Sequence, residues 1–302
     1  MAKEFRQREW DRHAEDDCRQ LVRLAVREDL DRSLDWTTAI LVPREARGAA
    51  RIVARNAGIV AGLAAVPVIL DELQVDIAWQ PSAADADSLV PGQCVARLAG
   101  AARDLLTSER IVLNFLNRLT GIATQTRRYV DAIEGTGVRL YDTRKTVPGW
   151  RRLEKYAVRC GGARNHRLGL FDAVLIKDNH LAFAGALSPA EAVRRTKQHL
   201  AEHGDGGIRD AMVEIEVDTL EQLRAVLPEG PDIVLLDNMT LSELKEAVAI
   251  RSELGPSVEL EASGGIQLAT LRAVAETGID RISSGALTHS AVAFDFGLDW
   301  ET

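Results

Sequence analysis

The chain has 302 residues, of which 46% are hydrophobic, with a formal net charge of -8 and a sequence pI of about 5.4. Such a composition supports a well-buried globular core and excludes extended disorder. The acidic balance and an aromatic content of only 5% argue against a nucleic-acid partner, because no basic stripe is interleaved with aromatic side chains.

Neither export nor membrane insertion is expected. The first 30 residues are dense in charge, which excludes the apolar core of a signal peptide. The longest uncharged run, Asn56–Leu70, has about fifteen residues and contains Pro67, whereas a membrane helix needs roughly 20 apolar residues. The cysteines at 18, 94 and 160 are too scattered to predict a disulfide framework or a zinc site. We therefore expect a cytoplasmic protein with no membrane contact and a small-molecule partner.

Residues 1 to about 130 are predicted to form a separate α+β unit. An amphipathic helix is expected around Cys18–Glu28, and alternating segments at Ala49–Asn56 and Cys94–Leu98 indicate half-buried strands. The apolar spacing over Leu105–Thr120 predicts a helix that leads toward the next unit.

The rest of the chain repeats a short β-branched run followed by a charged, helical stretch. This repeat predicts a parallel α/β barrel, and six clear strands allow an incomplete one. Thr240 and Glu243 form the pattern of a helix N-cap and its reciprocal partner. The predicted strands are Val138–Tyr141, Ala173–Ile176, Met212–Val217, Asp232–Leu236, Val258–Leu260 and Asp280–Ser283.

A cationic segment runs from residue 142 to 178, with nine Lys and Arg against four Asp and Glu, a balance of +5. A charge run of this kind is more often a solvated surface. Here, however, Arg144, Lys145 and Lys177 directly follow predicted buried strands, where α/β proteins keep their chemistry. The segment is therefore predicted to hold anions.

Three carboxylates lie on, or directly after, the next two predicted strands. Glu214 and Glu216 project to the same side of one strand, and Glu216 is the better site candidate because it is nearer the carboxyl end. Glu214 is as readily explained by a pairing that only stabilises the core. Asp237 could cap a helix, but Asn238 could do the same, so Glu216 and Asp237 favour a cation or ribose site.

Two loops of small residues follow the last two strands, at Ser263–Ile266 and Ser283–Ala286. Glycine there serves tight turns, but two such loops in succession favour a phosphate site. The sequence has no Ser-His-Asp spacing, HExxH, P-loop or GxGxxG motif, so hydrolase, kinase and dehydrogenase functions lack support.

Taken together, these motifs resemble quinolinate phosphoribosyltransferase over nearly the whole chain, in the order that family uses. They are Asp142-Thr-Arg-Lys-Thr-Val-Pro-Gly149, Glu154-Lys-Tyr-Ala-Val-Arg-Cys-Gly-Gly162, Asn165-His-Arg-Leu-Gly169, Leu175-Ile-Lys-Asp-Asn-His180, Glu214-Ile-Glu-Val217, Leu235-Leu-Asp-Asn-Met239, Leu260-Glu-Ala-Ser-Gly-Gly-Ile266 and Ile282-Ser-Ser-Gly-Ala-Leu-Thr-His289.

The resemblance implies the type II phosphoribosyltransferase fold. An N-terminal α/β sandwich domain is expected over residues 1–128, with the tail 287–302 packed back on it. An incomplete, roughly seven-stranded α/β barrel is expected over residues 129–286. The resemblance also implies a homodimer in which Arg110 reaches into the neighbouring subunit's site.

The implied reaction converts quinolinate and phosphoribosyl pyrophosphate to nicotinate mononucleotide, pyrophosphate and CO2, with Mg2+, in de novo NAD biosynthesis. Lys145, Glu216 and Asp237 match the family's catalytic residues, and the latter two match its metal and ribose ligands. The remaining matches divide between two groups. Quinolinate would be held by Arg110, Arg144, His166, Arg167 and Lys177, and phosphoribosyl pyrophosphate by Lys145, Glu216, Asp237, Ser263, Gly264 and Gly285.

Two alternatives stay open at this stage. A paralogue could use another anionic acceptor, such as nicotinate or the substrate of the related molybdenum-uptake-associated proteins, although the full cationic set favours a dicarboxylate. A non-catalytic barrel could sense a phosphorylated nucleotide, although Lys145, Glu216 and Asp237 are all present. Arg164 could be an extra substrate contact, but a surface cation is favoured.

Overall fold

The computed structural model describes residues 4–185, 187–203 and 209–301, and these form two compact units. No helix within these residues combines the length and the apolar character needed to cross a membrane. The barrel unit comprises residues 4–7, 128–145 and 163–286, and the sandwich unit comprises residues 8–127, 146–162 and 287–301.

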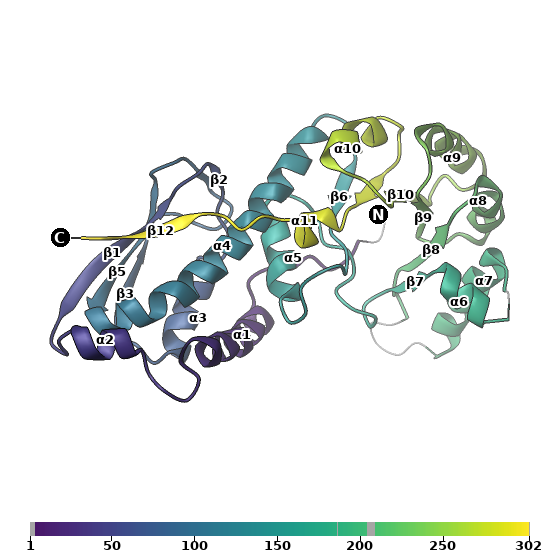
Figure 1. The fold of residues 1–302 in the computed structure, drawn as a ribbon. Coiled ribbons are helices and arrows are strands. Elements are labelled where there is room, and N and C mark those ends of the chain that lie inside the picture. The colour runs from purple at the N-terminus through teal and green to yellow at the C-terminus, as the bar shows by residue number, and fades with distance from the viewer. Residues whose placement is uncertain (1–3, 186, 204–208, 302) are drawn as a thin grey trace. The chain divides into compact units, whose positions relative to one another are not determined.

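The barrel unit is built on a parallel sheet with the strand order β6-β11-β10-β9-β8-β7 (Figure 1). These strands are the six predicted runs, which are rich in Val, Ile and Leu because both faces of a parallel sheet are buried. An isolated parallel bridge between Tyr141 and Arg164 places one more segment beside β6. The strands are β6 (Arg139–Tyr141), β7 (Val174–Ile176), β8 (Val213–Val217), β9 (Ile233–Asp237), β10 (Glu259–Ser263) and β11 (Arg281–Ser283).

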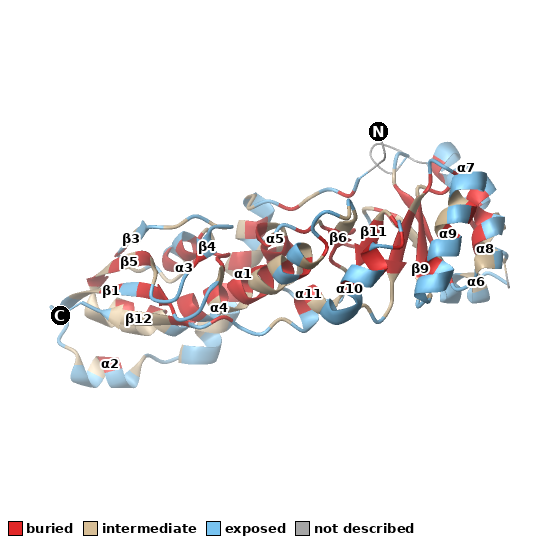
Figure 2. Ribbon diagram, turned by 90° about the horizontal axis from the view of Figure 1, so that it is seen from above, coloured by how far each residue is buried: buried red, intermediate tan, exposed pale blue. Residues whose placement is uncertain are grey.

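Helices follow the strands of this unit. Figure 2 shows β9 and β11 as buried, whereas α8, α9 and α10 carry exposed residues. The predicted cap of α9 is confirmed: the Thr240 side chain accepts from the Glu243 N-H, and the Glu243 carboxylate accepts from the Thr240 N-H. The helices are α6 (Asp178–Phe183), α7 (Pro189–His203), α8 (Leu220–Val226), the 3-10 helix η2 (Leu227–Glu229), α9 (Leu241–Leu254) and α10 (Leu268–Ala275).

The sandwich unit carries an antiparallel sheet with the order β12-β1-β5-β3. The predicted helix at Leu105–Thr120 lies within a helix of 31 residues, α4. The strands are β1 (Arg47–Ala54), β2 (Gly58–Ile59), β3 (Ile77–Pro81), β4 (Ser88–Leu89), β5 (Cys94–Ala101) and β12 (Phe296–Trp300). The helices are α1 (Arg12–Leu30), α2 (Trp36–Leu41), α3 (Ala65–Glu72), α4 (Ala102–Ala132, in this unit up to Arg127), α5 (Arg151–Cys160) and α11 (Ala286–His289, from Leu287).

The two units differ from the continuous ranges 1–128 and 129–286 in two segments. Residues 146–162 belong to the sandwich unit, because α5 packs against α1 and Arg152 pairs with Asp17 at 2.9 Å. Residues 4–7 belong to the barrel unit. The C-terminal strand β12 pairs with β1, so the tail completes one edge of the sandwich unit's sheet.

Candidate active site

A cavity of about 620 Å³ lies in the barrel unit where the parallel strands end. Lys177 directly follows β7, and Arg144 and Lys145 follow β6 by three and four residues. Strands β9 and β10 end in Asp237 and Ser263, and Glu216 is the last but one residue of β8. The lining residues are Thr143, Arg144, Lys145, His166, Arg167, Leu175, Lys177, Glu216, Leu235, Asp237, Asn238, Ser263, Gly264, Gly265 and Ser283.

Most predicted site residues meet in this cavity. Two do not line it. Arg110 lies on α4 in the sandwich unit, where its side chain is 64% exposed and 3.7 Å from Glu109. Gly285 lies two residues beyond the lining residue Ser283. Those that do line the cavity are Arg144, Lys145, His166, Arg167, Lys177, Glu216, Asp237, Ser263 and Gly264.

Sequence reasoning did not assign Thr143, Leu175, Leu235 or Asn238 to a site. Gly265 and Ser283 belong to the two loops that were predicted to hold a phosphate, although neither was named as a site residue. Thr143 and Asn238 directly adjoin predicted residues in the sequence, and that adjacency was the available signal. Leu175 and Leu235 are ordinary members of apolar strands, so nothing in their pattern distinguishes a leucine that faces a ligand from one that faces the core. They give the cavity apolar surface suited to a flat ring.

Two guanidinium groups are held close together in the cavity. Arg167 is buried, and its Nη1 donates to the carbonyl of Ala173 at 3.2 Å. Burial lowers the pKa of Arg167, the charge of Arg144 lowers it further, and Glu214 and Asp172 act in the opposite direction. The two positive charges lie close together where burial limits their hydration. Binding of an anionic ligand between them is therefore favoured.

On the acidic side of the site, Lys177 Nζ forms an ion pair with Glu216. Burial raises the pKa of Glu216, and the nearby carboxylates Asp237 and Asp178 raise it further, against the effect of Lys177. Asp237 accepts a hydrogen bond from Asn238 Nδ2 at 2.7 Å. The carboxylates around Glu216 and Asp237 repel one another, and a bound divalent cation would reduce this repulsion. Mg2+ suits the site because it prefers oxygen ligands.

The loop after β10 is shaped around Asn238. The Asn238 N-H donates to the carbonyl of Ser263 at 3.0 Å, and Asn238 has a left-handed backbone with φ 54°. Gly264 has φ 88°, and a Cβ there would overlap Asn238 Oδ1. Only glycine therefore fits this position without displacing the side chain that bonds Asp237.

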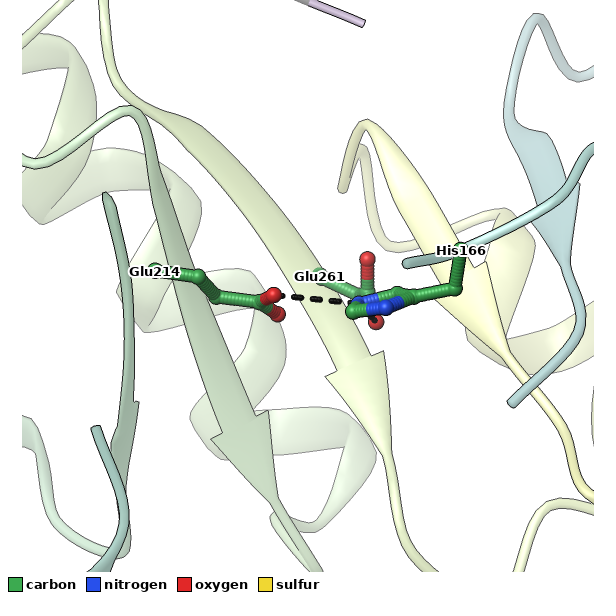
Figure 3. Close-up of side chains that lie close together, drawn as sticks. All are labelled: His166, Glu214 and Glu261. Carbon is green, nitrogen blue, oxygen red and sulfur yellow. Dashed lines mark ion pairs between the residues drawn. The ribbon is translucent and has the colours of Figure 1, made fainter. Parts of the chain in front are cut away.

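Both ring nitrogens of His166 face protein atoms, one through a hydrogen bond and the other through ion-pair contacts. Its Nδ1 accepts the N-H of Arg167 at 2.9 Å, so the neutral ring carries its proton on Nε2. Nε2 lies 3.0 Å from Glu214 and 3.6 Å from Glu261 (Figure 3). Although His166 lines the cavity, its nitrogens are directed at protein atoms. This geometry favours a role in which His166 holds the backbone of Arg167 over the predicted role in which His166 donates to a substrate carboxylate.

The two glutamates beneath His166 are completely buried. Burial raises the pKa of Glu261, and the charge of Glu214 raises it further. Among the described residues, the ligand atoms of His166, Glu214 and Glu261 lie within 4.8 Å of one another, which is close enough for all three to bind one metal ion. The 3.0 Å contact between His166 and Glu214 is an ion-pair contact, and neither carboxylate oxygen of Glu214 has a hydrogen-bond partner among the described residues.

Residues 35–120 match the family described as quinolinate phosphoribosyl transferase, N-terminal domain, and residues 122–299 match its C-terminal domain. The chain belongs to the quinolinate phosphoribosyltransferase family. It is therefore an enzyme, a pentosyltransferase, and the predicted fold of an N-terminal α/β domain and an α/β barrel is confirmed. The lining residues, from 143 to 283, all lie within the C-terminal match.

Named relatives agree with this family assignment. The chain is 43% identical over 289 residues to a nicotinate-nucleotide pyrophosphorylase [carboxylating] of Mycobacterium leprae, covering 94% of this chain and 97% of the relative. It is 35% identical to a mitochondrial quinolinate phosphoribosyltransferase [decarboxylating] of Nicotiana tabacum, covering 96% and 84%.

Solved structures show the same fold. The nicotinate-nucleotide pyrophosphorylase of Francisella tularensis superposes with a TM-score of 0.87 at 34% identity, covering 99% of this chain and all of that one. Human nicotinic acid phosphoribosyltransferase, at 13% identity and a TM-score of 0.59, shares the fold alone.

Proposed function

We propose that the protein transfers the phosphoribosyl group from phosphoribosyl pyrophosphate to quinolinate, with decarboxylation, to give nicotinate mononucleotide, pyrophosphate and CO2 in de novo NAD biosynthesis. One observation carries this proposal. A single cavity brings the repelling pair Arg144 and Arg167 together with the acidic pair Glu216 and Asp237. A dicarboxylate would neutralise the charges of the first pair, and a ribose with a bound cation would bind the second.

Quinolinate is a dianion with a flat aromatic ring. Arg144, Arg167 and Lys177 supply charge for its two carboxylates, and Leu175 and Leu235 supply apolar surface for the ring. Because Lys177 pairs with Glu216, a quinolinate carboxylate would compete for Lys177 and release Glu216 toward the ribose. Binding of quinolinate would thus make Glu216 available to bind the ribose of phosphoribosyl pyrophosphate.

Bond formation joins the ring nitrogen of quinolinate to C1′ of the ribose while the bond from C1′ to pyrophosphate breaks. Positive charge develops on the ribose, where Glu216 and Asp237 can stabilise it and bind the hydroxyls. Lys145 lies in the same cavity and would neutralise negative charge on the two substrates. The loop at Ser263 and Gly264 would hold the phosphate through backbone N-H groups.

Decarboxylation follows from the charge that this step leaves on the ring. The bond from C2 to its carboxylate breaks, CO2 leaves, and the electron pair on C2 is stabilised by the adjacent pyridinium nitrogen before it takes a proton. No organic cofactor is needed as an electron sink. Glu216 and Asp237 would hold Mg2+, which when bound would neutralise the departing pyrophosphate.

We further propose a cytoplasmic homodimer in which Arg110 of one subunit completes the site of the other. The exposure of Arg110 supports this, since within the described parts of the chain its guanidinium has only a 3.7 Å ion-pair contact with Glu109, and it belongs to the sandwich unit and not to the unit that carries the candidate active site. The added cation would complete the charge set for a dicarboxylate.

The deciding assay supplies purified protein with Mg2+, phosphoribosyl pyrophosphate and either quinolinate or nicotinate, while CO2 and nicotinate mononucleotide are followed together. Equal release of both products from quinolinate alone is the expected result. Product from nicotinate without CO2 would assign the protein to a nicotinate-using paralogue. Binding of phosphoribosyl pyrophosphate without turnover of either acceptor would favour a sensor.

A further inference from the structure

The residues Glu4–Gln7, called here the N-terminal arm, bind three consecutive residues of the barrel unit. Gln7 Oε1 accepts the N-H of Asn165 at 2.8 Å, and Gln7 Nε2 donates to the carbonyl of the same residue at 3.2 Å. The side-chain amide thus pairs with Asn165 as a neighbouring strand would. Arg164 Nη1 donates to Glu4 at 2.6 Å. The Arg164 side chain is 43% exposed and does not line the cavity, which agrees with the favoured expectation of a surface cation.

Phe5 anchors the arm in the barrel core. Its side chain is buried and shares a hydrophobic cluster with Tyr141 of β6 and Ile233 of β9. The Phe5 ring also lies against the imidazole of His166, with ring centroids 4.2 Å apart. Glu4 accepts a hydrogen bond from the Tyr141 hydroxyl at 2.7 Å. Burial of an aromatic side chain makes this attachment worth more than its hydrogen bonds alone.

The segment that the arm binds contains His166 and is followed by Arg167, and both of these residues line the cavity. Beside β6, the segment Arg164–Arg167 has a single bridge, between Arg164 and Tyr141, instead of a full strand ladder. The carboxylate of Asp142 adds bonds from the His166 N-H at 2.9 Å and from Asn165 Nδ2 at 2.7 Å. His166 then fixes the backbone N-H of Arg167. A shift of this segment would therefore move the guanidinium of Arg167.

We infer that the N-terminal arm is a positioning element for the dicarboxylate site. It acts through His166 and the backbone of Arg167, and it touches no cavity surface itself. The inference rests on the proposed function, because it assigns quinolinate to the cations that the arm positions. Loss of the arm should weaken quinolinate binding more than binding of phosphoribosyl pyrophosphate, because the expected ligands of the latter, apart from Lys145 and Gly285, lie on β8, β9, the end of β10 and the loop after it.

Two substitutions test the arm through different contacts. Gln7→Met keeps the size of a partly exposed side chain but removes both hydrogen bonds to Asn165, so it should fold normally. Phe5→Ala removes the ring against His166, and Phe5→Leu restores most of its apolar volume. Arg6→Ala is the matched control, because the Arg6 side chain is in the same arm and exposed.

The measurements are KM for each substrate, the dissociation constant of quinolinate by calorimetry, and the melting temperature. Gln7→Met and Phe5→Ala should raise both KM and Kd for quinolinate about tenfold, with KM for phosphoribosyl pyrophosphate within about twofold. Phe5→Leu should recover most of the loss, and Arg6→Ala should match the wild type.

Several results would overturn the inference. An unchanged quinolinate Kd in folded Gln7→Met would do so, as would an equal rise of both KM values, which indicates general loosening. A lower melting temperature with unchanged KM values would leave the arm only a structural role. If the wild type neither binds nor converts quinolinate, the proposed function itself fails and the inference falls with it, whereas wild-type turnover with unaffected variants refutes the arm alone.

Discussion

His166 Nε2 lies 3.0 Å from a carboxylate oxygen of Glu214, in a part of the barrel unit where Glu214 is fully buried. The other ring nitrogen is occupied by the N-H of Arg167. This arrangement makes Glu214 the residue that orients the imidazole and, through it, the loop carrying Arg167. The strand β8 thus presents one glutamate to a buried histidine and the next, Glu216, to the cavity.

Replacement of Glu214 by Leu should leave the buried His166 Nε2 without its nearest ion-pair partner. We expect a loss of about 1 to 3 kcal/mol in the free energy of unfolding, with a higher KM for quinolinate. Glu214→Gln is the matched variant, since it keeps a polar oxygen beside Nε2 and removes a charge next to Glu261. Urea unfolding should therefore place Gln closer to the wild type than Leu, and equal destabilisation by Gln and Leu would contradict a stabilising polar contact between Glu214 and His166.

Gly264→Ala tests the loop after β10. Alanine at φ 88° costs about 1 to 2 kcal/mol, and its Cβ would also displace Asn238 from Asp237. We expect KM for phosphoribosyl pyrophosphate to rise about tenfold. Gly265→Ala is the control, because φ there is 60° but a Cβ would meet no atom within 4 Å. A similar KM change in both variants would show that backbone strain, and not Asn238, controls the site.

Local patterns were sufficient to predict the six barrel strands, the Thr240 cap and most of the cavity lining. A β-branched run and the polar residue that ends it are adjacent in sequence, and parallel strands bring such ends together. The arm could not be predicted in this way. Gln7 and Asn165 are 158 positions apart, and nothing near Gln7 differs from an ordinary polar residue. The place of α5 in the sandwich unit likewise depends on packing against α1.

Lys145→Ala should abolish turnover while leaving the fold and assembly intact. Lys145 is exposed in the cavity, so its loss creates no void in the core. Removal of a group that stabilises charge in the transition state typically lowers kcat by about 100-fold or more. Circular dichroism and gel filtration should match the wild type, and near-normal kcat would refute the assigned role.

The contribution of Glu4 to stability should depend on pH. Burial acts to raise its pKa, but hydrogen bonds from Tyr141 and Arg164 and the charge of Arg281 outweigh this, so the pKa of Glu4 is lowered below 4.5. A carboxyl group with a lowered folded-state pKa stabilises the protein above about pH 4.5, and that contribution disappears as the pH falls through the folded-state value.

The check is the difference in unfolding free energy between the wild type and Glu4→Gln from about pH 7 down to about pH 3. The difference should be largest near neutral pH and shrink on acidification. Glu45→Gln, at an exposed position of the sandwich unit, corrects for loss of one negative charge. A Glu4 difference that is constant with pH would mean that the ionised carboxylate is not what holds the arm.

Subunit complementation tests whether Arg110 acts in the neighbouring subunit. Arg110→Ala and Lys145→Ala should each be nearly inactive alone. In a mixed dimer, the barrel of the Arg110→Ala chain keeps Lys145 and receives an intact Arg110 from the other chain, so one of its two sites is complete. Random reassociation of equal amounts should then restore about a quarter of wild-type activity. Lys145→Ala mixed with Lys177→Ala is the control, since both changes lie in the barrel unit and every mixed site keeps one defect. If the Arg110→Ala and Lys145→Ala mixture stays as inactive as this control, Arg110 does not complete a neighbour's site.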